Sequence, residues 1–122
     1  MNKKVNEVVQ GGIYIANFGD RTGNVKAGIR PVLIVSTNKN NAYSNVVLVA
    51  PITTLKEKHK KKSYYSDIVL EKTERNKLKA VSVVQCGEIQ TLDKESVLYK
   101  IGSLDEFKKE EVNKALLSSP SG

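Results

Sequence analysis

The 122-residue chain has one cysteine, one histidine, three prolines and no tryptophan. With Cys86 alone, the chain can form neither an internal disulfide nor a cysteine-based zinc site. Its apolar runs are short, and none approaches the roughly 20 residues that a membrane-spanning helix needs. Residues 1–12 are polar and lack the apolar core of a secretory signal. These absences lead us to expect a cytoplasmic protein with no membrane segment.

Acidic residues are fewer than basic residues. The chain has 13 Asp and Glu against 20 Lys and Arg, a formal net charge of +7. On a small domain such an excess favours a polyanionic partner, most simply nucleic acid, although a basic surface can also serve solubility alone. Length and composition predict one globular domain over residues 1–122. Within it we expect a flexible arm over residues 1–10 and a tail over 118–122.

The chain is expected to be organised around the segment Gly28-Ile29-Arg30-Pro31-Val32-Leu33-Ile34-Val35-Ser36. Its last five residues are apolar and β-branched almost throughout, which predicts a strand buried on both faces. Pro31 favours an extended conformation at Arg30, so the backbone sets the direction of the guanidinium. Because a guanidinium cannot enter a dry core unpaired, the segment predicts either an anion site or a structural ion pair at a strand edge.

The remaining pattern predicts mainly β structure with a C-terminal helix. We expect a turn at 38–41, a bend at 87–88, and further strands over residues 12–18, 46–50, 67–70, 80–86, 89–94 and 97–101. If the strands flanking the first turn are antiparallel neighbours, Arg30 and Thr53 lie on the same rim. Ser103 and Glu106 read as a capping box at the start of the helix. That helix is expected to pack on the strands through Leu104, Phe107, Val112, Ala115 and Leu116.

Two polar segments are candidate ligand contacts. The loop over 19–28 contains three glycines and leads into Arg30, which is typical of a functional loop. Residues 56–62 contain five lysines and His59, and two tyrosines follow at 64 and 65. This run is interpreted either as a solvated hairpin loop or as an arm that contacts phosphates and stacks bases on its tyrosines.

Several motifs, taken in chain order, resemble the MazF/PemK/Kid family of toxin endoribonucleases from Gly11 to about Leu117. The matching segments are Gly11-Gly12-Ile13-Tyr14, Gly28-Ile29-Arg30-Pro31-Val32-Leu33-Ile34, Pro51-Ile52-Thr53, then Leu78, Ser82, Val83-Val84 and Thr91-Leu92-Asp93-Lys94. Gly12 replaces an acidic residue that is usual in the family. Gln85 and Gly87 stand where the Kid branch has an active-site arginine and aspartate. The chain is therefore closer to the Gram-positive MazF-like branch.

The resemblance implies an SH3-like barrel that works as a homodimer with single-stranded RNA laid across the interface. It implies sequence-specific, metal-independent and cofactor-free cleavage, in which the ribose 2′-hydroxyl attacks the adjacent phosphorus. Arg30 and Thr53 are the implied catalytic residues, and the general base is unassigned between Glu88 and His59. The implied RNA-binding residues are Arg21, Lys26, Thr54, Lys56, Lys58, Lys60, Gln85 and Glu88. The family further implies an acidic antitoxin that competes with RNA for the same groove.

Two other interpretations stay open at this point. The same basic barrel could be a nucleic-acid-binding module without catalysis, or a domain whose groove takes an acidic peptide. An RNase assay on unstructured RNA in EDTA separates catalysis from both.

Overall fold

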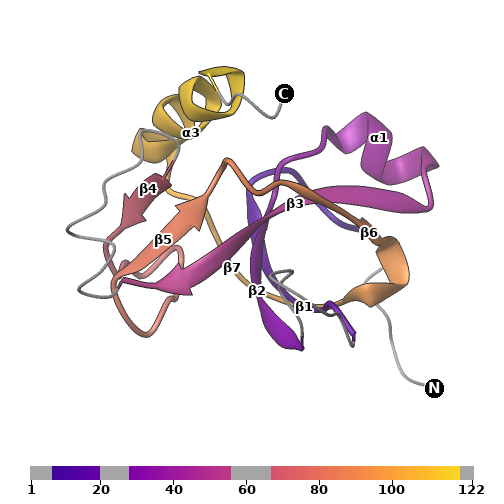
Figure 1. Ribbon diagram of the computed structural model, residues 1–122, viewed down its shortest axis with the longest axis horizontal. Helices are drawn as coiled ribbons and strands as arrows, with labels where there is room; N and C mark the ends of the chain where they lie inside the picture. The colour runs from indigo at the N-terminus through magenta and orange to yellow at the C-terminus, as the bar shows by residue number, and fades with distance from the viewer. Residues whose placement is uncertain (1–6, 20–27, 56–66, 119–122) are drawn as a thin grey trace.

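The computed structural model describes residues 7–19, 28–55 and 67–118, and within these ranges the chain is mainly β with a C-terminal helix, as expected (Figure 1). The elements in chain order are β1 (Gly12–Asn17), β2 (Ile29–Ile34), α1 (Asn38–Tyr43), β3 (Val46–Thr54), β4 (Asp67–Leu70), β5 (Ser82–Gln85), β6 (Gln90–Asp93), the 3-10 turn η1 (Lys94–Ser96), β7 (Val97–Ser103) and α3 (Glu106–Ser118).

All strand pairs are antiparallel, and the strand order is β4-β5-β3-β2-β1-β7, with β6 also paired to β3. Figure 1 shows β3 spanning the molecule from the side of α1 to the side of β4 and β5. Among the described strands no ladder joins β4 to β7, so the strongly bent sheet forms an open, SH3-like barrel.

Strand β2 is buried on both faces, as its apolar run predicts. Val32, Leu33 and Ile34 are each at most 1 % exposed. Val32 and Ile34 join a cluster with Tyr14, whereas Leu33 points to the other face, where α3 covers the sheet. Each such side chain stabilises the fold by about 1.5–3 kcal/mol through burial. The observed strand spans Ile29–Ile34, so it starts earlier and ends earlier than the apolar run.

Strand β3 runs through the proline at which its end was expected. It pairs with β6 over Val46–Val49 and with β5 over Ile52–Thr54. On the opposite side, between the two ladders, the segment from β5 to β6 has five residues, 85–89, where β3 has only residues 50 and 51. This confirms the bend expected at 87–88, where the amide of Glu88 donates to the carbonyl of Gln85 at 3.0 Å. Pro51 lies opposite this bend, an irregular position where a strand tolerates proline.

The turn expected at residues 38–41 is wrong, because these residues begin the helix α1. Thr37 is its N-cap, and its hydroxyl accepts a hydrogen bond from the amide of Asn40. Asn41 is buried, accepts from the hydroxyl of Ser36 at 2.6 Å and donates to the carbonyl of Ser36. The cap and this buried side-chain contact outweigh the turn preference of an asparagine-rich segment.

The expected start of the C-terminal helix is also wrong. Ser103 is the last residue of β7, and its amide donates to the carbonyl of Arg75. Of the expected packing residues, Val112 and Ala115 are buried but Phe107 is 74 % exposed. Phe107 lies five residues before Val112, about 140° away around the helix at roughly 100° per residue, which is outside the stripe that faces the sheet.

Residues 7–10, at the end of the segment expected to form an arm, make specific contacts. Val8 is buried, and the amide of Val9 donates to Oη of Tyr14 at 3.1 Å. The backbone amide of Gln10 donates to Oδ1 of Asn38 at 2.7 Å, and its side-chain amide donates to the carbonyl of Val35. These bonds fasten the entry to β1 onto the end of β2 and onto α1.

Candidate active site

Arg30 and Thr53 come to the same end of two neighbouring strands. The ladder between β2 and β3 pairs Val32 with Pro51. This is the last pair of the ladder, and Arg30 and Thr53 each lie two residues beyond it, so both project from the same end of the two strands. Thr53 in turn pairs with Val83 on β5. The sheet therefore brings a cation and a hydroxyl to the same end of β2 and β3, at the rim of the barrel.

Arg30 is half-buried as a whole residue. Its guanidinium forms no hydrogen bond or ion pair with any residue in the ranges 7–19, 28–55 and 67–118. The alternative interpretation, a structural ion pair, therefore has no acidic partner for Arg30 in that part of the chain. A guanidinium that these residues leave unpaired is suited to hold an external anion through two parallel hydrogen bonds.

The hydroxyl of Thr53 is in a similar position. The residue is half-buried, and its side chain makes no hydrogen bond to the described residues. A hydroxyl that the described residues leave unbonded, at the same strand end as the guanidinium, can donate to an oxygen of the same bound anion. Together the two side chains match the donor requirements of a phosphodiester.

Gln85 lies on the same face, one row further along β5. It pairs with Asp67, and it stands two residues after Val83, the partner of Thr53. The residue is 8 % exposed, and its Oε1 is fully buried with no hydrogen-bond partner in the described structure. A buried acceptor left unsatisfied costs about 1–3 kcal/mol, so such groups call for an explanation.

The other residues expected to bind RNA do not all gather at this face. Thr54 is exposed but follows Thr53 in the strand, so its side chain points to the opposite face. Glu88 is exposed in the bend after β5. Arg21, Lys26, Lys56, Lys58, Lys60 and the candidate base His59 lie outside the described residues.

Cys86, next to Gln85, points into the core beneath α3 and is fully buried. Burial, and to a smaller degree the negative charge of Asp67, raises the pKa of its thiol to about 12. A thiol that stays protonated in this way is not a nucleophile at neutral pH. Within the described ranges, no group of three or more His, Cys, Asp or Glu is placed to hold a metal ion. The same ranges contain no helix long and apolar enough for a membrane span.

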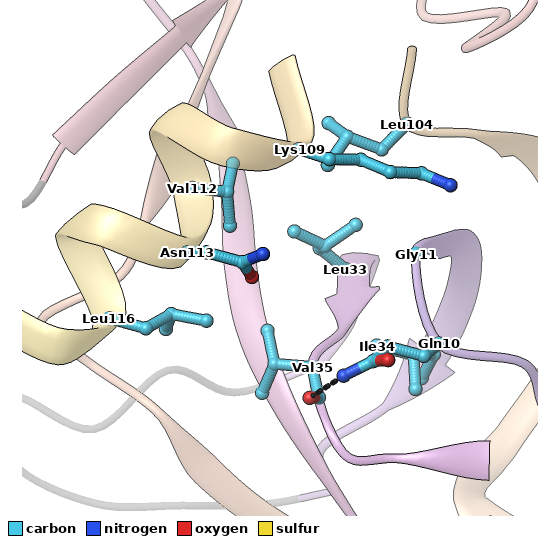
Figure 2. Close-up of a pocket in the computed structure, with 10 residues that line it drawn as sticks. All are labelled: Gln10, Gly11, Leu33, Ile34, Val35, Leu104, Lys109, Val112, Asn113 and Leu116. Carbon is cyan, nitrogen blue, oxygen red and sulfur yellow. Dashed lines mark hydrogen bonds between the residues drawn. The ribbon is translucent and has the colours of Figure 1, made fainter. Parts of the chain in front are cut away.

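A cleft at the other end of β2 was not anticipated from the sequence. It has a volume of about 100 Å³ and lies between one side of α3 and the entry to β1. Figure 2 shows Val112, Asn113 and Leu116 of α3 on one side and Gln10, bonded to Val35, on the other. Its lining comes from three distant parts of the chain, so no local pattern marks it.

The open barrel has a helix on one face and, at one rim, polar groups that the described residues leave unpaired, which defines a small β-barrel protein with a candidate anion-binding surface. A profile of the family described as "PemK-like, MazF-like toxin of type II toxin-antitoxin system" matches residues 9–119, and the chain belongs to this family.

Individual relatives agree with this assignment. The chain is 36 % identical over 107 residues to a protein named Endoribonuclease MazF from Staphylococcus saprophyticus, an alignment that covers 88 % of this chain and 86 % of the relative. Among solved structures, Mycobacterium tuberculosis toxin MazF-mt6 superimposes with a TM-score of 0.68 at 26 % identity, covering 86 % and 91 % of the two chains. MazF from Deinococcus radiodurans gives a TM-score of 0.73 at 20 % identity, covering 92 % and 94 %, a likeness that concerns the fold alone.

Proposed function

We propose that this protein is a MazF-type endoribonuclease that cleaves single-stranded RNA and thereby inhibits translation and growth. The observation that carries the proposal is the half-buried Arg30 at the same end of β2 and β3 as Thr53, with both side chains left without a hydrogen bond by the described residues. The relative from Staphylococcus saprophyticus, which is named an endoribonuclease, supports the same activity.

The reaction that fits these groups uses the RNA's own nucleophile. The 2′-hydroxyl loses its proton as it attacks the adjacent phosphorus, and the bond from phosphorus to the 5′-oxygen breaks as that oxygen takes up a proton. A 2′,3′-cyclic phosphate and a 5′-hydroxyl end result. Arg30 contacts two non-bridging oxygens, where negative charge grows in the transition state, and Thr53 donates to one of them. Because Arg30 supplies the positive charge, the step needs no metal ion. The guanidinium keeps its charge at any working pH.

We further propose that the enzyme acts as a homodimer. On the sheet face that carries Ile13 and Leu33, but away from α3, a patch of apolar side chains is only partly covered. Tyr99 of β7 is 55 % exposed and pairs with Ile15, which pairs with Pro31, while Ile29 beside them is 65 % exposed. We call these four residues the Tyr99 patch. Contiguous apolar patches of this kind on small proteins mark contact surfaces.

An acidic antitoxin is the proposed regulator. One structural neighbour is described as an endoribonuclease in complex with its cognate antitoxin, from a mycobacterial species. For the present chain, a net charge of +7 and an arginine at the rim that the described residues leave unpaired would attract an acidic segment to the same surface as RNA. Competition between the two ligands follows from this overlap.

A cleavage assay tests the proposed activity. Purified protein is incubated with a long unstructured RNA in EDTA, and the termini of the fragments are determined. We expect cuts within a short sequence motif and fragments with 2′,3′-cyclic phosphate and 5′-hydroxyl ends. Binding of the RNA without any cleavage would overturn the enzyme assignment and leave a nucleic-acid-binding module.

A further inference from the structure

Gln85 is the one buried polar residue in the described ranges whose side chain is left with an unsatisfied buried atom. The others use their polar atoms inside the protein: Ser36 bonds Asn41, and Ser82 donates to the carbonyl of Ala80. Asn76 accepts from the amides of Thr73 and Leu78 and donates to the carbonyl of Glu71. A side chain retained only for the fold would be expected to be satisfied in the same way.

The sheet register places this unsatisfied group close to the candidate phosphate site. Thr53 stands opposite Val83, and Gln85 follows two residues later on the same face. Diagonal neighbours of this kind are about 7–8 Å apart between their Cα atoms. A phosphate held by Arg30 and Thr53 would therefore have one of its flanking nucleosides within reach of Gln85.

From this placement we propose that Gln85 contacts the substrate and determines part of the sequence specificity: its Oε1 accepts a hydrogen bond from an N–H of a base next to the scissile phosphate. This inference rests on the proposed endoribonuclease function and adds the residue that reads a base. The unsatisfied atom is an acceptor, so the matching partner is a donor. Exocyclic amino groups of adenine, cytosine and guanine, and ring N–H groups of guanine and uracil, are the donors that distinguish bases.

Access to Oε1 requires the side chain to turn toward the RNA. A glutamine side chain moves between staggered rotamers, and its amide stands at the far end of the chain. In the free protein Oε1 forms no hydrogen bond with the described residues, so the rotation breaks none there. A bound base with a donor gains a bond at this atom, whereas a base without one leaves the acceptor unpaired. Discrimination of this kind is strong because the wrong ligand leaves a polar group unsatisfied.

The test uses Gln85→Met, which keeps the shape of the side chain and removes the amide, and Gln90→Met as a matched control on β6. Each protein cleaves a library of RNA with randomised positions, and the cut sites are sequenced. For Gln85→Met we expect discrimination at one position beside the cut to fall roughly 10- to 100-fold, with preferences elsewhere unchanged. Gln90→Met is expected to keep the full motif.

Thermal unfolding of the same variants separates this role from a structural one. Removing an unsatisfied acceptor should leave the melting temperature of Gln85→Met unchanged or higher. A lower melting temperature with the motif intact would show a structural glutamine and overturn the inference. Cleavage by Gln85→Met with the full wild-type motif overturns the inference alone, whereas a wild-type protein that cuts no RNA overturns the proposed function and this inference together.

Discussion

Gly102 of β7 lies directly against the backbone of Asn76. A Cβ at position 102 would stand 2.3 Å from the carbonyl oxygen of Asn76 and 2.8 Å from that of Arg75. Both obstacles are backbone atoms, and the side-chain bonds of Asn76 to Glu71 and Thr73 hold this loop in place. The loop after β4 can pack closely on β7 only because residue 102 has no side chain.

Gly102→Ala is accordingly expected to lower the free energy of unfolding by about 1–3 kcal/mol, the usual range for overpacking. Ser103→Ala, at the half-buried neighbouring residue, is the control and should change it by less than about 0.5 kcal/mol. Urea denaturation of both variants gives the comparison. Equal stabilities would show that the loop moves aside without penalty.

The parts of the fold that depend on one dominant pattern could be predicted from the sequence. Burial of β2 on both faces follows from its continuous apolar run, and the bend at 87–88 follows from a glycine in a strand. The errors occurred where a local signal competed with a contact distant in sequence. Ser103 looks like a helix cap, but pairing with β1 keeps it in β7.

The candidate site likewise has one part that could be predicted from the sequence and one that could not. That Arg30 and Thr53 lie at the same strand end could be predicted, because a proline, a short apolar run and an antiparallel pair indicate which ends of the two strands meet. The unsatisfied Oε1 of Gln85 could not be predicted. Whether this atom finds a hydrogen-bond partner depends on the residues of β3 and β4 that lie next to β5. No local sequence pattern predicts which residues these are.

The packing of α3 can be tested with one buried and one exposed residue. Val112→Ala should destabilise the protein by about 2 kcal/mol, because Val112 is 3 % exposed and fills the core beneath the helix. Phe107→Ser should change stability by less than about 0.5 kcal/mol despite the larger side chain, since Phe107 is 74 % exposed. Chemical denaturation measures both, and the reverse order would contradict the observed orientation of the helix.

The raised pKa of Cys86 predicts an alkaline loss of stability. The folded protein holds the thiol proton up to a pKa of about 12, whereas the unfolded chain releases it near the ordinary value of 9.0. The contribution is fully present below pH 9 and is lost as the pH rises from 9 toward 12, because only the unfolded state then gains by ionising. Stability measured from pH 8 to 11 should fall less steeply for Cys86→Ala. Parallel slopes for the two proteins would show that the thiol does not contribute.

The same burial predicts low chemical reactivity of Cys86. Iodoacetamide at pH 8 should modify the native protein slowly and the denatured protein rapidly, since the thiolate is the reactive form. Mass spectrometry follows the adduct over time. Rapid modification of the native protein would mean that the core around Cys86 opens readily.

The Tyr99 patch predicts where a charged residue disrupts the proposed homodimer. Tyr99→Arg introduces a charge into the centre of the patch, so we expect the dimer dissociation constant to rise at least 10-fold. Tyr43→Arg is the matched control, because Tyr43 on α1 is 85 % exposed and lies outside the patch. Sedimentation velocity over a range of concentrations compares them. Dissociation caused only by Tyr43→Arg would move the interface to the side of α1.

Substitutions at Arg30 and Thr53 test the proposed chemistry most directly. Arg30→Ala should lower the cleavage rate roughly 10²-fold or more, the scale of removing one preorganised donor to a developing negative charge. Arg30→Lys keeps the charge but loses the two parallel hydrogen bonds, so a substantial part of that loss should remain. Thr53→Val keeps the shape without the hydroxyl and should also slow cleavage, whereas Thr54→Val, on the opposite face of β3, is the control and should not.

Single-turnover cleavage rates of these variants test the prediction, with circular dichroism to check that each variant is folded. If folded Arg30→Ala and Thr53→Val cut RNA at the wild-type rate, these residues are not the catalytic pair, and the chemistry takes place elsewhere on the barrel.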